Sequence, residues 1–212
     1  LYGSAGMDAF EATLNGPASM TRTGSTTTEA NGFATVYGYG TVGGSDTATL
    51  HDSAVADQFY GYASYGLMKD VGNTYKSYAL DFATVTGNAS DADDVAYFYD
   101  SPGLDTFTAT LNGSASMTRA GASTSTANGF ATVYGVGTAG GSDTATLNGS
   151  AAADVFYGYE TSSLMKDVGG NYKSYAYNFS TTTGNASGAG DLAYLYGSAG
   201  MDAFEATLNG PA

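Results

Sequence analysis

Residues 46–61, DTATLHDSAVADQFYG, decide the fold of this chain. Apolar Ala48 and Leu50 alternate with polar neighbours, and Phe59 belongs to a second alternating segment. The two segments are separated by a turn that contains Ser53 and Asp57. Alternation with a period of two indicates strands that turn one face toward a core. The stretch therefore predicts two short strands joined by a turn.

The same pattern recurs at 94–107, 143–156 and 191–204, always with the two aspartates at the same spacing. Residues 98–194 repeat residues 1–97 without a gap, and residues 195–212 are identical to residues 1–18. Each unit divides into similar halves, 1–49 and 50–97 in the first, and 98–146 and 147–194 in the second. We therefore expect two tandem units and the start of a further identical unit at 195–212. Because the sequence stops in the phase in which it begins, we expect a longer array or end-to-end pairing of copies.

Short strands with small residues at the bends are typical of a solenoid. We predict an all-β protein, a parallel β-solenoid (β-helix), in which each strand pairs with the equivalent strand of the next coil. A coil of about 24 or about 48 residues would fit the repeat lengths. The alternative is a row of small antiparallel β-sandwiches, one in each unit, for which the half repeat is short.

Composition argues against several functional classes. The net charge of −14 argues against a nucleic-acid partner, which requires basic clusters. The chain has no Cys and a single His, so neither a thiolate metal site nor a conventional catalytic triad is available. No apolar run is long enough to span a membrane. Since the acidic features are repeated or isolated, we expect no enzyme.

Aspartates that recur at the strand starts are the candidate site residues. They are Asp8, Asp46, Asp57, Asp94, Asp105, Asp143, Asp154, Asp191 and Asp202. Stacked carboxylates could hold Ca²⁺, which prefers oxygen ligands. Alternatively, each side chain caps backbone N–H groups at its turn, and no cofactor is required. The segment Asp91-Ala-Asp93-Asp94 is the strongest single cation candidate, although the second unit has Gly188 and Gly190 in the positions of its first two aspartates.

Threonines, tyrosines and basic residues are further candidates for surface features. Thr47-Ala-Thr49 is similar to Thr-x-Thr arrays that bind ice, but it occurs once per unit, so we expect no regular Thr grid. Outward tyrosines such as Tyr60 and Tyr157 could pack laterally or contact glycans. The basic residues are expected to be solvated charges or to form ion pairs between coils. They are Arg22, Lys69, Lys76, Arg119, Lys166 and Lys173.

The motif D-x-A-x-[LF]-x-x-S-x-x-x-D-x-F-x-[AG], often preceded by Gly-Gly-Ser, resembles Gly/Asp-rich tandem repeats of very large secreted or surface proteins of bacteria. It is distantly similar to the calcium-binding nonapeptide repeats of RTX proteins, which Gly3 to Phe10 fit in part. The resemblance implies an extracellular or cell-surface protein that works by stacking and by assembly with copies of itself, as part of a fibre, sheath or giant adhesin. The alternative is an adhesion module that binds calcium or surface glycans.

Overall fold

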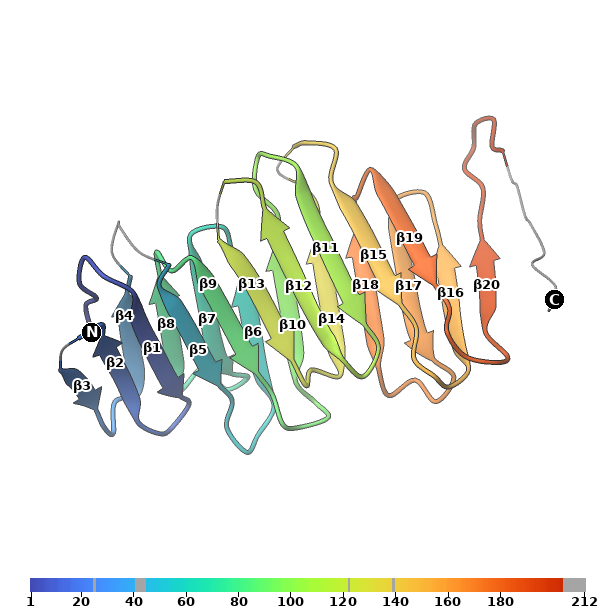
Figure 1. Cartoon of the computed structure of the whole chain (residues 1–212). Coiled ribbons are helices and arrows are strands. Elements are labelled where there is room, and N and C mark those ends of the chain that lie inside the picture. Colours follow the sequence, from blue (N-terminus) through green and yellow to red (C-terminus); the bar gives the residue numbers. More distant parts are fainter. Residues whose placement is uncertain (25, 41–44, 122, 139, 204–212) are drawn as a thin grey trace.

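The computed structural model describes residues 1–24, 26–40, 45–121, 123–138 and 140–203. These residues form twenty strands and no helix. The strands make two ten-stranded sheets that lie face to face along the whole length of the molecule (Figure 1). Gly43-Gly44, which precede the motif at residues 46–61, and residues 204–212 of the expected further unit lie outside the described residues.

The first sheet contains, in spatial order, β3 (Thr27–Ala30), β2 (Ala18–Arg22), β1 (Asp8–Thr13), β5 (Thr47–His51), β9 (Thr84–Asn88), β13 (Thr124–Asn128), β12 (Ser114–Arg119), β11 (Asp105–Thr110), β15 (Thr144–Asn148) and β19 (Thr181–Asn185). The second sheet contains β4 (Thr35–Tyr39), β8 (Lys76–Leu80), β7 (Tyr65–Asp70), β6 (Asp57–Gly61), β10 (Val95–Tyr99), β14 (Thr132–Val136), β18 (Lys173–Tyr177), β17 (Ser162–Asp167), β16 (Asp154–Gly158) and β20 (Leu192–Leu195).

The predicted solenoid is confirmed, because strands of successive coils lie parallel and side by side. β5 pairs with β1 and β9, and β10 pairs with β6 and β14. Since β9 and β10 of the first unit pair with β13 and β14 of the second, both sheets run through both units. The alternative of separate sandwiches is therefore wrong.

The coil length differs from both values expected from the repeat. Residues that meet between neighbouring coils are 37 to 41 positions apart, as in the pairs Asp57–Asp94 and Thr35–Lys76. The difference arises because each half repeat also contains three consecutive antiparallel strands: β1-β2-β3, β6-β7-β8, β11-β12-β13 and β16-β17-β18. Within each triplet, successive strands lie nearer to the N-terminal end of the sheet, opposite to the direction in which the coils advance (Figure 1).

Equivalent strands of the two halves lie on opposite sheets and do not pair with each other, contrary to the prediction. β1 belongs to the first sheet, whereas β6, its equivalent in the next half, belongs to the second. A shift by a whole unit, from β1 to β11, returns the strand to the same sheet. The long repeat therefore returns each strand to its own sheet, whereas the half repeat moves it to the opposite sheet.

The core lies between the sheets and consists of columns of Phe, Met, Leu and Ala. Phe59 and Phe107 are fully buried, and each lies against a glycine of the opposite sheet. A Cβ atom on Gly135 would lie 2.4 Å from the ring of Phe107, and one on Gly87 would lie 2.6 Å from the ring of Phe59. Each of these bulky rings therefore needs a glycine opposite it.

Candidate functional site

Five Ser–Asp turns hold the second aspartate of every motif. In each turn the aspartate accepts hydrogen bonds from the backbone N–H and the hydroxyl of the serine four residues earlier. At Asp57, for example, the Ser53 nitrogen lies 2.6 Å from Oδ2. The turns involve Ser4 and Asp8, Ser53 and Asp57, Ser101 and Asp105, Ser150 and Asp154, and Ser198 and Asp202.

The first aspartate of each motif links neighbouring coils. Oδ1 of Asp94 accepts a hydrogen bond of 2.7 Å from the backbone N–H of Asp57. The same link, at 2.8 Å, joins Asp46 to Asp8, Asp143 to Asp105, and Asp191 to Asp154. All nine candidate aspartates therefore accept backbone N–H groups, and the bonds to Asp46 and Asp143 come from a neighbouring coil and not from their own turns. Whether any of them also binds a cation stays a prediction.

One acidic cluster differs from this regular series of hydrogen-bonded aspartates. Carboxylate oxygens of Asp52, Asp91 and Asp94 all lie within 4.8 Å of one another. Asp57 is next to this group, since its N–H donates to Asp94; it is fully buried and its Oδ1 has no hydrogen-bond partner. The sequence indicated Asp91 and Asp94, whereas Asp93 is exposed and outside the group. It gave no signal for Asp52, which the fold brings in from the turn after β5.

Burial controls the protonation of this acidic cluster. Burial, together with the negative charges of Asp52 and Asp57, raises the pKa of Asp94 to about 6, although two backbone hydrogen bonds act in the opposite direction. Burial likewise raises the pKa of Asp57, with the charges of Asp52 and Asp70 acting in the same direction. A divalent cation would reduce this repulsion, and carboxylate oxygens are the type of ligand that a hard cation prefers.

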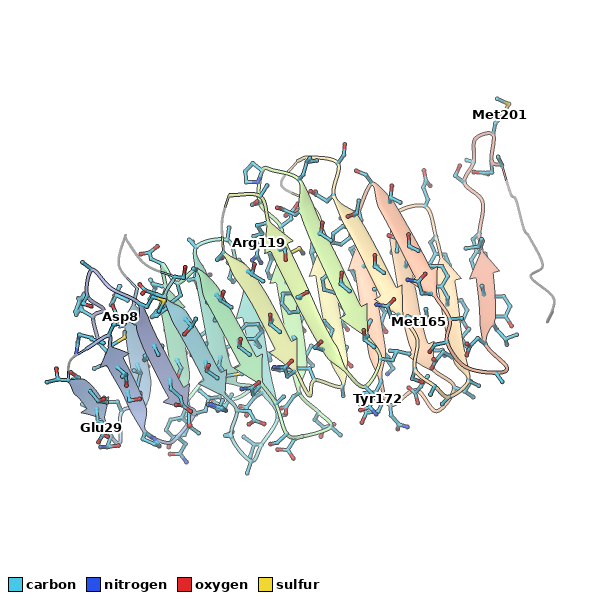
Figure 2. The ribbon with its side chains drawn as sticks, viewed as in Figure 1. Asp8, Glu29, Arg119, Met165, Tyr172 and Met201 are labelled. Carbon is cyan, nitrogen blue, oxygen red and sulfur yellow. The ribbon has the colours of Figure 1, made fainter. Side chains whose placement is uncertain are left out.

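The corresponding place in the next coil contains an arginine. Arg119 lies opposite Asp105 in the antiparallel register, whereas Asp70 lies opposite Asp57. Arg119, which is labelled in Figure 2, is 2% exposed and donates to the carbonyls of Tyr99 and Gly61. The expectation of a solvated charge is therefore wrong for this residue. Burial lowers the pKa of Arg119 to about 10, and the nearby charges of Asp105 and Asp100 oppose that change. The positive charge of Arg119 thus lies near the carboxylates of Asp105 and Asp100.

The outer surface of the second sheet carries a continuous row of large side chains, here called the Tyr row. Neighbouring rings stack with centroids 4.7 to 5.2 Å apart. In spatial order the row is Tyr37, Tyr78, Leu67, Tyr60, Tyr97, Tyr134, Tyr175, Leu164, Tyr157 and Tyr194. All four lysines lie on this same surface, and the amines of Lys69 and Lys166 lie over the rings of Tyr60 and Tyr157.

The outer surface of the first sheet is built differently and carries two parallel rows of hydroxyl side chains. One row is Thr47, Thr84, Thr124, Thr118, Thr106, Thr144 and Thr181; the other is Thr49, Thr86, Thr126, Ser116, Thr108, Thr146 and Thr183. We call these two rows the Thr face. The expectation that no regular Thr grid forms is wrong, because the fold interleaves strands from both halves of the repeat.

Comparisons with protein-family models, with curated proteins and with solved structures find no match to this chain. In the described part of the chain, no helix is long and apolar enough to cross a membrane. The strand order and the coil-to-coil pairing define a β-solenoid protein with two chemically distinct faces.

Proposed function

We propose that this chain is a structural repeat segment of an extracellular or cell-surface assembly, extended by further coils, and that it is not an enzyme. The observation that carries the proposal is the uncovered core at β20. Leu195 is 59% exposed, whereas Phe98, one unit earlier in the same place, is fully buried. Ala193 is exposed where Ala96 is fully buried.

Solenoid stability comes from contacts between neighbouring coils, so an uncovered end coil favours the addition of another. Among the described strands, β19 and β20 lie at the ends of the two sheets, and their outer edges present backbone groups to which a further strand can hydrogen-bond. A covering coil from the same chain or from a second copy satisfies both requirements. The acidic net charge keeps such a rod soluble, and stacking replaces disulfides as the source of stability.

Sedimentation at increasing concentration, with electron microscopy of the same samples, tests the end-to-end assembly. We expect rods longer than one chain, and we expect Leu195→Glu to shorten them because it places a charge at the uncovered core. Leu192→Glu is the matched control, since Leu192 belongs to the same strand and lies on its outer face. A chain that stays monomeric at all concentrations, or equal effects of both substitutions, would contradict this mode of assembly.

A second candidate function is cation binding at the acidic cluster. The observation that favours it is the buried, unpartnered Oδ1 of Asp57 beside three carboxylates, at a place where the next coil has Arg119. Calorimetric titration with CaCl₂ tests it. We expect heat of binding for the parent chain and for Asp93→Asn, and its loss in Asp91→Asn. An unchanged Asp91→Asn titration, or no binding by the parent chain, excludes this site.

A further inference from the structure

The Thr face has a regular geometry that follows from its backbone. Strands in a sheet are about 4.8 Å apart, and alternate residues of one strand are about 6.7 Å apart. The seven strands β5, β9, β13, β12, β11, β15 and β19 are consecutive in the first sheet and in unbroken register. The two rows therefore form a two-dimensional lattice of hydroxyl and methyl groups.

The side chains of this lattice are held in place before anything binds. Threonine is branched at Cβ, so its χ1 angle has few alternatives on a strand. Direct contacts between neighbours restrict it further, for example between the hydroxyls of Thr106 and Thr144, 3.5 Å apart. Two pairs of asparagines lie alongside, separated by Ser114 and Thr110, with amide hydrogen bonds of 3.0 Å from Asn128 to Asn88 and 2.9 Å from Asn185 to Asn148. Binding would therefore cost little side-chain entropy.

Charge is absent from the outward positions of this face between β9 and β19. The outward residues there are Thr, Ser and Asn, and all of those in the two rows are exposed or half-buried. The charged outward residues of the first sheet, Glu11, Glu29 and His51, lie at its N-terminal end, where Glu29 is labelled in Figure 2. Charged groups orient the neighbouring water molecules around themselves, and an uncharged surface does not reorganise the water above it in this way.

A comparison of the half repeats shows that the central outward residue of a strand depends on the sheet to which the strand belongs. The preference of threonine for strands does not explain this difference. Equivalent strands have similar inward residues, whereas the outward residue near the middle of the strand differs between the two sheets. β9 has Thr86 where β4 has Tyr37, β5 has Thr49 where β10 has Tyr97, and β11 has Thr108 where β16 has Tyr157. At these equivalent positions the second sheet has tyrosine and the first sheet has threonine.

From these four observations we propose that the Thr face binds the surface of crystalline ice. An ice surface presents water oxygens in an uncharged two-dimensional lattice whose repeats are close to the two spacings of the Thr face. Threonine hydroxyls can hydrogen-bond to lattice water while the methyl groups occupy the hollows between water molecules. Ordering water on a protein normally costs entropy, but the water of ice is already ordered. This binding does not depend on the extension of the rod by further coils.

Partition into slowly growing ice tests the proposal. The chain is labelled with an amine-reactive dye, which the four lysines direct mainly to the surface of the Tyr row, opposite the Thr face. We expect the labelled chain to be incorporated into the ice and to produce thermal hysteresis in an osmometer. Exclusion from the ice together with zero hysteresis overturns the proposal.

Matched variants locate the binding surface. Thr126→Tyr and Thr86→Tyr place a bulky ring in the middle of the Thr face, and we expect loss of incorporation and of hysteresis. Thr132→Tyr makes the same change on the second sheet, where Thr132 faces outward beside Val95, and we expect no loss. Circular dichroism at the assay temperature verifies that each variant is folded, and a misfolded variant is replaced by Thr126→Leu.

Two results would overturn the assignment to this face. The first is equal loss of ice binding in Thr126→Tyr and Thr132→Tyr. The second is binding of the parent chain to crystalline polysaccharide, measured by co-sedimentation with cellulose or chitin, without incorporation into ice.

Discussion

The backbone N–H of Asp105 donates a hydrogen bond of 2.8 Å to Oδ1 of Asp143, a residue 38 positions later in the chain. Both residues are buried, at 2% and 4% exposure. Neither carboxylate is free, because Asp105 also caps the turn at Ser101. The recurrent aspartates thus take part in the backbone hydrogen bonding of the solenoid and connect one coil to the next.

Replacing Asp143 with alanine is expected to destabilise the fold by about 1–3 kcal/mol, because it leaves a buried N–H group without a partner. The melting temperature and the urea midpoint measure this effect. Asp93→Ala removes an exposed aspartate of the same chain and is expected to leave both unchanged. Similar midpoints for the two variants would show that the link between coils contributes nothing.

The contact between Gly135 and Phe107 gives a second prediction. Gly135→Ala places a Cβ atom 2.4 Å from a fully buried ring, so the ring or a strand must move. We expect a loss of about 1–3 kcal/mol from overpacking, part of which Phe107→Leu restores in the double variant. Gly6→Ala is the control, because its nearest neighbour is Thr23 at an ordinary 3.5 Å. Additive effects of the two substitutions would argue against the contact.

The Tyr row gives a third prediction. Tyr97 stacks on Tyr60 and on Tyr134, both at 5.0 Å. Tyr97→Thr removes both contacts, each worth about 0.5–1.5 kcal/mol beyond the buried area. We expect a lower melting temperature and a weaker near-ultraviolet circular dichroism signal. Val95→Thr changes an outward residue of the same strand without removing a ring contact, and an equal effect there would contradict this account.

The solenoid could be predicted from the sequence because period-two alternation and turn residues are local signals. The antiparallel triplets were missed, although a local signal for two of them exists. Asn15-Gly16 and Asn112-Gly113 are dipeptides typical of tight hairpins, and both asparagines have positive φ angles, of 55° and 53°. The coil length was missed for the same reason, since the triplets take up residues without advancing along the axis.

The functional surfaces were harder to predict because they are composed of strands that are distant in the sequence. In the Thr face, Thr124 lies between Thr84 of the preceding unit and Thr118 of its own triplet. A search for a repeated Thr-x-Thr motif counts strands within one unit and cannot show this interleaving. The acidic cluster was predicted only in part, because Asp52 reaches Asp91 and Asp94 through the coil-to-coil register and not through local spacing.

The acidic cluster gives a prediction of pH dependence. The pKa of Asp94 is about 6 in the folded chain, above its ordinary value of 3.8. A carboxyl group with a raised folded pKa binds more protons in the folded than in the unfolded state between these two values. Its contribution to stability is therefore fully present below pH 3.8 and is lost as the pH rises to about 6. Carbon-detected NMR titration of the Asp94 carboxyl measures the folded pKa directly.

Asp52→Asn provides the variant for this prediction, because the charge of Asp52 contributes to the raised pKa of Asp94. We expect the variant to lower the Asp94 pKa and to reduce the loss of melting temperature between pH 4 and pH 6, while Asp93→Asn changes neither. Added CaCl₂ should reduce the same loss in the parent chain if the cluster binds calcium, because a bound cation favours the ionised carboxylates. An Asp94 carboxyl that titrates near its ordinary value would show that burial and the neighbouring charges do not act on it.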